Sequence, residues 1–240
     1  MARYNLEACL SPVIFDRYAD PEAIVVVIDI LRASSAICNA FASGAESIIP
    51  VSELEEAKDY KEKGYMVAAE RDGHVLDFAD FGNSPFNFTK DRVRKKTIVY
   101  STTNGTRTIR KASECYRVVI GSFLNISSLS DWLVQQNRNI ILLCAGWKGK
   151  VCLEDSVFAG ALAARLLDDE KYYTICDSVS IVLDLWEFAK TDLLAYIDKA
   201  AQRNRLKEKG LDECIPFCHH EDSTDAIPFL DGGRLFDLKK

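Results

Sequence analysis

Four acidic residues follow or begin apolar segments of this 240-residue chain, where an ionised carboxylate is costly unless it is paired or bound to a metal. Asp29 ends the run IVVVID, Glu70 ends a later apolar run, and Glu154 and Asp155 begin an expected helix. Carboxylates suit Mg²⁺, which needs only one or two of them with substrate phosphate and water. We therefore predict metal ligands among Asp29, Glu70, Glu154 and Asp155. The alternatives are helix caps: Asp29 before the next helix, and Glu154 and Asp155 at a favourable dipole end.

The segment STTNGTR, residues 101–107, is dense in hydrogen-bond donors and carries one guanidinium group. A phosphate needs many donors and a cation, so this segment predicts an anion site, although it is not a Walker loop. Arg32 is close enough in sequence to pair with Asp29 or to bind an anion through two nitrogens. The predicted catalytic residues are Asp29, Arg32, Glu154 and Asp155. The predicted substrate-binding residues are Arg71, Asn83, Ser84, Thr102, Thr103, Asn104, Gly105, Thr106, Arg107, Ser122, Asn125 and Lys148.

Cysteine and histidine offer weaker candidates. Cys144 stands at a strand end, where it is either an activated thiolate or a structural thiol, and no histidine is near it in sequence. Cys214 and Cys218 precede His219 and His220, but this spacing fits no standard zinc pattern. The eight cysteines are scattered, several of them inside apolar runs, so we expect buried, reduced thiols.

Alternating strand and helix patterns must position these residues. Strands are expected at 24–29, 46–51, 65–70, 97–100, 117–120 and 139–144, and helices at 33–43, 53–63, about 105–113, 125–136 and 154–167. This alternation predicts an α/β fold with three layers, α/β/α, around a largely parallel or mixed sheet, whose strands bring their carboxyl ends to one edge. Because no linker divides the chain, residues 1–240 are expected to form one compact domain, which could consist of two similar α/β halves packed as one unit.

Three further segments have less regular patterns. Residues 72–93 contain Gly and Pro that interrupt any period, and we interpret them as a substrate-facing flap. Residues 186–209 predict one long amphipathic helix whose basic residues face solvent. Residues 227–230 and the chain after the turn at 231–233 predict two short edge strands.

Composition excludes several functions. The net charge is −6, which argues against binding nucleic acid. No apolar run approaches the ~18 residues of a membrane span, and the N-terminus has no secretory pattern, so a cytoplasmic protein that does not bind membranes is expected. A homo-oligomer is compatible with such a chain, but no surface can be assigned to it.

Six segments, in order, resemble the motifs of the 2-phosphosulfolactate phosphatase family. They are VVVIDILRASS (25–35), AERDG (69–73), FGNSP (81–85), STTNGTR (101–107), GSFLN (121–125) and CAGWKGKVCLED (144–155). The resemblance implies an α/β/α fold and a Mg²⁺-dependent hydrolysis of 2-phosphosulfolactate to sulfolactate and phosphate, a step in coenzyme M biosynthesis. The implied partner is therefore a small anionic phosphorylated substrate.

Two mechanisms and two other functions stay open at this point. Water activated by a carboxylate is favoured as the nucleophile, because the Asp-x-Asp pattern of aspartyl-phosphate enzymes is absent and Leu31 occupies its second position. Direct attack by Asp29, or by Cys144 as a thiolate, is the alternative. The protein could also hydrolyse another small phosphorylated hydroxy acid, or sense an anionic metabolite without catalysis.

Overall fold

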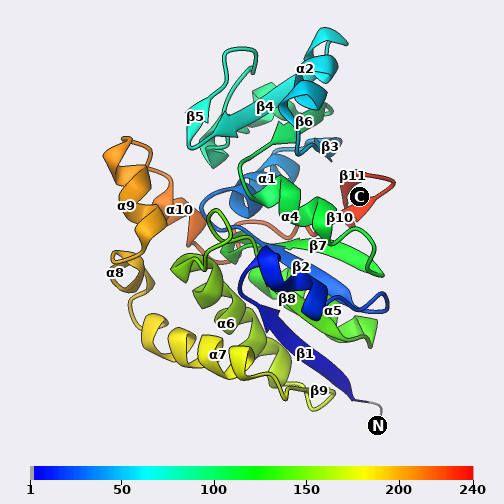
Figure 1. Cartoon of the computed structure of the whole chain (residues 1–240), viewed down its shortest axis with the longest axis vertical. Coiled ribbons are helices and arrows are strands. Elements are labelled where there is room, and N and C mark those ends of the chain that lie inside the picture. The colour runs from blue at the N-terminus through cyan, green and yellow to red at the C-terminus, as the bar shows by residue number, and fades with distance from the viewer. Residues whose placement is uncertain (1–2, 240) are drawn as a thin grey trace.

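The computed structural model describes residues 3–239, which form one sheet of eleven strands flanked by helices (Figure 1). The strand order is β5-β4-β6-β3-β11-β10-β7-β2-β8-β1-β9. The strands are β1 (Tyr4–Cys9), β2 (Ile24–Ile28), β3 (Ser47–Pro50), β4 (Met66–Arg71), β5 (His74–Val75), β6 (Thr97–Ser101), β7 (Arg117–Gly121), β8 (Ile140–Cys144), β9 (Tyr172–Tyr173), β10 (Pro228–Asp231) and β11 (Arg234–Asp237).

The helices lie on both faces of this sheet and beyond one of its edges (Figure 1). The α-helices are α1 (Ala33–Ala42), α2 (Leu54–Glu62), α3 (Lys90–Val93), α4 (Gly105–Lys111), α5 (Ile126–Gln136), α6 (Leu153–Leu167), α7 (Asp177–Ala189), α8 (Leu193–Ile197), α9 (Ala201–Glu208) and α10 (Ile215–Cys218). Short 3₁₀ helices span Pro12–Arg17, Pro85–Asn87 and Phe123–Asn125. The predicted α/β class and mixed, largely parallel sheet are confirmed.

Strand β2 shows why the sequence forms a layered core. All five residues of IVVVI are buried, as expected for a parallel strand covered on both faces. Ile24, Val26 and Ile28 pack into one apolar cluster with side chains of α5, α6 and α7. Val25 and Val27 point the other way, into a cluster with α1 and α4. Alternate side chains of one strand therefore join the two helical layers to the sheet.

Strand β1 was not predicted, although it lies inside the sheet. It pairs in parallel with β8 on one side and with β9 on the other. Its sequence, YNLEAC, contains two polar residues and lacks the continuous apolar run that identifies β2. The pairing of β1 is therefore fixed by distant strands rather than by its own pattern.

The C-terminal hairpin occupies the middle of the sheet, so the prediction of two edge strands is wrong. Strand β11 pairs antiparallel with β3, where Leu235 faces Ile48 across the ladder, and β10 pairs antiparallel with β7, where Phe229 faces Val119. The hairpin thus joins the parallel group β4-β6-β3 to the parallel group β7-β2-β8-β1-β9. Two sets of α/β units become one continuous sheet through the last strands of the chain.

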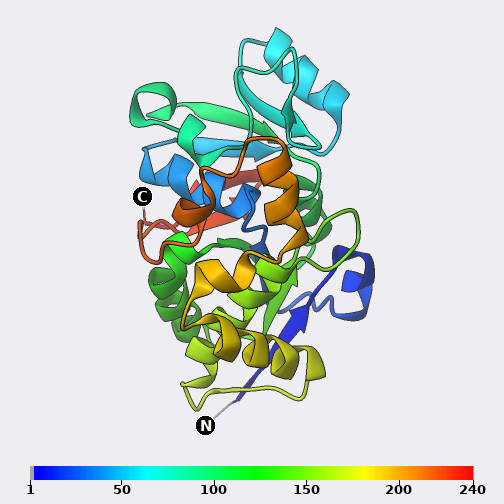
Figure 2. The same cartoon turned by 90° about the vertical axis from the view of Figure 1, so that its left-hand side faces the viewer.

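The single helix predicted over residues 186–209 is also wrong, because the chain forms three helices there. Helix α7 ends at Ala189, and Asp192 caps α8 by accepting a hydrogen bond from the backbone N–H of Ala195 at 3.0 Å. An N-cap aspartate starts a new helix in a new direction. The break lets α9 turn across the edge of the sheet to which the strands' carboxyl ends point (Figures 1 and 2).

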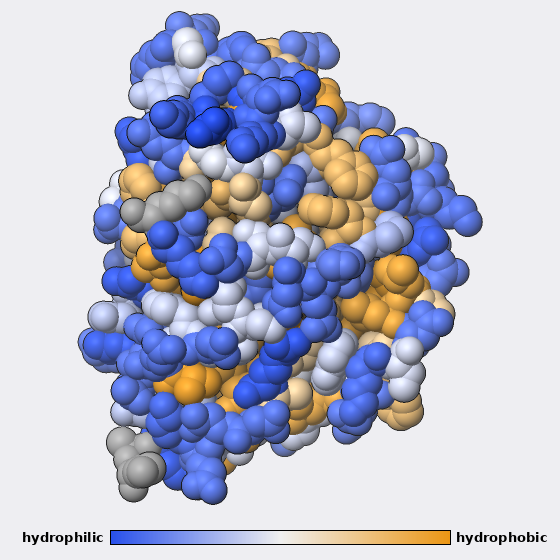
Figure 3. All heavy atoms as spheres, turned by 180° about the vertical axis from the view of Figure 1, so that it is seen from behind, coloured by the Kyte–Doolittle hydropathy of each residue, from blue (hydrophilic) through white to orange (hydrophobic). Residues whose placement is uncertain are grey.

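Polar side chains cover most of the face opposite that of Figure 1, with smaller hydrophobic patches between them (Figure 3). Within residues 3–239, no helix is both long enough and apolar enough to cross a membrane.

Leu235 provides a test of the role of the hairpin. It is fully buried, so Leu235→Ala is expected to lower the free energy of unfolding by about 2–5 kcal/mol in urea denaturation. Phe188→Ala serves as a control, because Phe188 is 72% exposed and its truncation should cost under about 0.5 kcal/mol. Equal effects of the two substitutions would show that the hairpin does not stabilise the sheet.

Candidate active site

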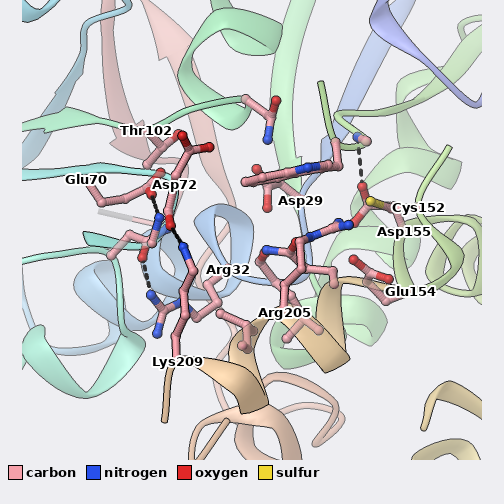
Figure 4. Close-up of a pocket in the computed structure, with 18 residues that line it drawn as sticks. Asp29, Arg32, Glu70, Asp72, Thr102, Cys152, Glu154, Asp155, Arg205 and Lys209 are labelled. Carbon is pink, nitrogen blue, oxygen red and sulfur yellow. Dashed lines mark hydrogen bonds between the residues drawn. The ribbon is translucent and has the colours of Figure 1, made fainter. Parts of the chain in front are cut away.

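A pocket that is partly open to solvent lies at the carboxyl ends of the parallel strands (Figure 4). This is the edge where open α/β sheets bind ligands. Eight of the residues predicted from the sequence line it: Asp29, Arg32, Glu70, Asn83, Thr102, Asn104, Glu154 and Asp155. The other lining residues are Leu31, Asp72, Gly73, Gly146, Trp147, Cys152, Gln202, Arg205, Leu206 and Lys209.

Asp29 directly follows β2 and offers an open oxygen to the pocket. Its Oδ1 accepts a hydrogen bond from the backbone N–H of Ala33 at 3.2 Å, so the predicted cap of the next helix is present. Its Oδ2 accepts no hydrogen bond from residues 3–239. A Cβ at position 105 would lie 2.8 Å from this oxygen and 2.6 Å from the Cβ of Ala33, which explains the glycine there. Burial, with Glu70 and Glu154 nearby, raises the pKa of Asp29 from 3.8 to about 7.

Glu154 is a second buried carboxylate with an open oxygen. It lies in the first turn of α6 with only 1% of its surface exposed, and its Oε2 has no hydrogen-bond partner in the described chain. Burial raises the pKa of Glu154. A buried polar atom without a partner is costly, so this oxygen is suited to a ligand that enters the pocket.

Both carboxylate oxygens of Asp155 accept hydrogen bonds from backbone N–H groups. Its Oδ1 accepts a hydrogen bond from Ile30 N–H at 2.9 Å, and its Oδ2 accepts one from Gly146 N–H at 3.0 Å. Burial and the neighbouring carboxylates of Glu154 and Asp29 raise the pKa of Asp155. These contacts tie the loops after β2 and β8 together, which favours a positioning role over the predicted metal-binding one.

Glu70, near the end of β4, also accepts hydrogen bonds from loop residues with both of its carboxylate oxygens. Its Oε1 accepts hydrogen bonds from the N–H and the hydroxyl of Thr103, at 2.9 and 3.1 Å, and its Oε2 accepts one from Gly73 N–H at 2.6 Å. Glu70 therefore fixes the loop after β6 and the first turn of the expected flap. The flap itself contributes Asp72, Gly73 and Asn83 to the pocket.

Arg32 is the buried cation of the pocket, with 5% of its surface exposed. Its Nη2 donates to Asn83 Oδ1 at 2.6 Å, and its Nη1 lies 3.9 Å from Cys214 Sγ. Asn83 therefore orients the guanidinium from the flap side. A buried guanidinium beside open carboxylate oxygens can hold an oxyanion in the pocket.

The C-terminal segment brings further cations that sequence reasoning placed on a solvated face. Arg205 from α9 lies over the ring of Trp147, with 4.5 Å between guanidinium carbon and ring centroid. The Nζ of Lys209 donates to the carbonyl of Asp72, whose carboxylate also pairs with Lys148 at 2.8 Å. Figure 4 shows Arg205 and Lys209 entering from the α9 side of the pocket. The sequence feature that could have revealed the position of α9 is Asp192, because an aspartate that caps a new helix interrupts the long helical pattern of residues 186–209.

Nine predicted substrate-binding residues do not line this pocket: Arg71, Ser84, Thr103, Gly105, Thr106, Arg107, Ser122, Asn125 and Lys148. Most of their donors are used within the protein. Arg71 donates to the carbonyls of Glu70 and Ser52. Ser122 and Asn125 are buried and form a capping box.

The rest of the predicted anion segment lies beside the pocket. Thr102 and Thr106 hydrogen-bond each other across the start of α4. Arg107 and Lys148 line a neighbouring cavity that shares Asn104 with the main pocket.

The cysteine candidates have structural contacts instead. Cys144 is fully buried, and burial holds its pKa well above the usual value, so it is a thiol rather than a thiolate. Cys214 hydrogen-bonds with Cys218, and His219 contacts the carbonyl of Ile215 at 2.8 Å through Nδ1. In the described part of the chain, no three His, Cys, Asp or Glu side chains are arranged to hold a metal ion.

The fold and the pocket together define an α/β protein with a site for a small anionic ligand. The sequence model of the 2-phosphosulpholactate phosphatase family matches residues 11–233. The chain therefore belongs to the 2-phosphosulfolactate phosphatase family, a family of phosphoric monoester hydrolases.

Three relatives carry the name "Probable 2-phosphosulfolactate phosphatase". The protein of Thermotoga maritima is 35% identical over 215 residues, covering 90% of this chain and 92% of the relative. That of Caldanaerobacter subterraneus subsp. tengcongensis is 34% identical over 218 residues, covering 88% and 89%. That of Clostridium beijerinckii is 30% identical over 216 residues, covering 88% and 90%. Each match extends over nearly the whole of both proteins.

The raised pKa of Asp29 predicts how stability depends on pH in the metal-free protein. Protonated Asp29 contributes stability that is fully present below its ordinary pKa of 3.8 and is lost as the pH rises through about 7. Asp29→Asn does not titrate. In EDTA, the free energy of unfolding of the wild type relative to Asp29→Asn should fall by roughly 1–4 kcal/mol over that range. A difference that is constant with pH would contradict the burial of this carboxyl group.

Proposed function

We propose that the protein is a Mg²⁺-dependent phosphatase that hydrolyses the phosphate monoester of 2-phosphosulfolactate to sulfolactate and phosphate, a step in coenzyme M biosynthesis. The observation that carries the proposal is the pair of open carboxylate oxygens, on Asp29 and Glu154, in a pocket that also holds the buried Arg32. The proposed substrate is the one named in the description of the family to which the chain belongs. Hydrolysis of such an ester requires charge neutralisation and positioning above all, because phosphate monoesters are very slow to react unaided.

Mg²⁺ fits the donors of this pocket. It prefers hard oxygen ligands and binds through one or two carboxylates while keeping several waters, so it needs no cluster of three protein ligands. Asp29 and Glu154 would hold it, since each keeps an oxygen that accepts no hydrogen bond within the described chain, and burial raises the pKa of both carboxyl groups. When bound, the ion would neutralise the phosphoryl oxygens and stabilise the departing alkoxide.

The chain's own groups then have separate roles. Arg32, held by Asn83, binds the phosphoryl oxygens and keeps them in the floor of the pocket. Asp29 accepts a hydrogen bond from the N–H of Ala33 with Oδ1, which leaves Oδ2 free to hold the ion. Asp155 and Glu70 keep the surrounding loops in place through their backbone hydrogen bonds.

Water is the nucleophile in this proposal. Cys144 does not line the pocket and its thiol is not ionised. Cys152 lines the pocket, but burial raises its pKa as well. Because a thiolate is the nucleophilic form, neither cysteine is suited to attack phosphorus at neutral pH.

Phosphate release from a panel of esters tests the substrate. With Mg²⁺, the wild type should hydrolyse 2-phosphosulfolactate faster than phospholactate or an aryl phosphate, and excess EDTA should abolish turnover. Asp29→Asn is expected to lose at least about 100-fold in kcat, because one of the two carboxylates that would hold the ion is gone. Asp131→Asn, an exposed change on α5, is the matched control and should keep wild-type rates. Preference for another ester would leave a phosphatase with a different substrate, and no turnover of any ester would favour the sensor.

Thermal unfolding tests the metal without relying on activity. At pH 8, where Asp29 is ionised, Mg²⁺ at about 100 times its Kd should raise the Tm by roughly 5–10 °C. Glu154→Gln and Asp29→Asn should lose most of this rise, whereas Asp131→Asn should retain it. An equal rise in all four proteins would place the ion elsewhere.

A further inference from the structure

Arg205 lies at the rim of the pocket, where neighbouring residues hold its side chain in place. Helix α9 is fixed across the pocket by the buried side chain of Leu206 and by Gln202, whose Nε2 donates to the carbonyl of Leu31 at 3.2 Å. On the same helix, Nε of Arg205 donates to Oε1 of Gln202 at 2.7 Å, and the guanidinium plane lies over Trp147. The side chain is thus held on two sides before any ligand enters.

The two terminal nitrogens of Arg205 are the open part of this group. Within residues 3–239, they donate to no protein atom, and no carboxylate oxygen lies within 4 Å of them. Arg203, two residues earlier, contrasts with this, because it forms ion pairs with Asp198 and Asp212 at 2.8 and 3.9 Å. The fixed fork of an arginine matches a planar or tetrahedral oxyanion that can accept two hydrogen bonds.

We propose that Arg205 binds a non-reacting oxyanion of the substrate, the sulfonate or the carboxylate, and so selects for an ester that carries this anion beside the phosphate. This inference rests on the proposed function and deepens it. The phosphoryl group belongs to the buried floor, where Arg32 and Glu154 are at most 5% exposed. Arg205 is half-buried at the rim, where the remainder of a substrate held at the floor must extend.

The other rim cation is less available. Lys209 is exposed, and its ammonium group is already engaged by the carbonyl of Asp72. Arg205 is therefore the lining cation of the rim, in the described chain, whose donors are free for a ligand. A specificity role follows from its position, because a substrate without the matching anion would leave the guanidinium unpaired.

Kinetics of Arg205→Gln with four substrates test the proposal. The substrates are 2-phosphosulfolactate, phospholactate, which lacks the sulfonate, the phosphate ester of 2-hydroxyethanesulfonate, which lacks the carboxylate, and p-nitrophenyl phosphate, which lacks both. For 2-phosphosulfolactate, kcat/KM should fall roughly 10- to 100-fold, mostly through KM, because a charge-assisted contact is lost. For p-nitrophenyl phosphate it should change less than about 3-fold. The two intermediate esters identify the anion, because only the one that retains it should be sensitive to the substitution.

Two further variants complete the design. Lys207→Gln removes an equal charge from an exposed position of the same helix and should behave as the wild type with all four substrates. Arg205→Lys keeps the charge but not the fork, so it should recover part of the lost kcat/KM for 2-phosphosulfolactate and for the intermediate ester that retains the bound anion. Near-wild-type Tm values confirm that the helix is intact.

A loss of similar size with all four substrates would overturn the proposal, because Arg205 would then serve the phosphoryl group. Unchanged kinetics with 2-phosphosulfolactate would overturn it too. If the wild type hydrolyses none of the esters, the proposed function fails by itself. Calorimetric titration with sulfolactate then decides the inference: a Kd roughly 10-fold weaker for Arg205→Gln than for the wild type supports it, and an equal Kd overturns it.

Discussion

Carboxylates buried at the carboxyl edge of the sheet are the constraint on which the rest of the site depends. An ionised carboxylate is stable away from water only when hydrogen bonds or a cation compensate it. Asp155 and Glu70 receive that compensation from backbone N–H groups, and in doing so they fix the loops after β2, β6 and β8 and the turn after β4 around the pocket. Asp29 and Glu154 each keep an open oxygen, so the folded chain concentrates negative charge where a divalent cation and a phosphate would meet.

The last third of the chain completes both the sheet and the pocket. The hairpin β10–β11 connects the two parallel groups of strands, and its antiparallel ladders set how far apart their carboxyl ends lie. Before it reaches the hairpin, the chain passes through α9, which crosses the same edge and carries Arg205 to Trp147. The acidic floor comes from the first two thirds of the sequence, whereas part of its cationic rim comes from the last.

Local sequence patterns were sufficient to predict the elements that consist of consecutive buried apolar residues. The all-apolar run of β2 and the residue after it identified Asp29, and the same rule for strand ends located Glu70 and Thr102. The same rule also selected Ser122 and Asn125, which do not line the pocket. They form a capping box, for which a loop rich in hydroxyls and amides is equally suited. The rule missed Arg205 and Trp147, which meet only because α9 folds back over distant strands. The central place of β10 and β11 likewise depends on pairing with β7 and β3, which no local pattern shows.

A crystal structure of the protein with Mn²⁺ in place of Mg²⁺ and with sulfolactate tests the central claim most directly. Manganese can be located by its anomalous scattering, and it accepts the same oxygen ligands. The account predicts one manganese peak in the main pocket, bound by the carboxylates of Asp29 and Glu154. A fully occupied ion bound elsewhere, or a liganded pocket in which neither carboxylate contacts the metal, would contradict it.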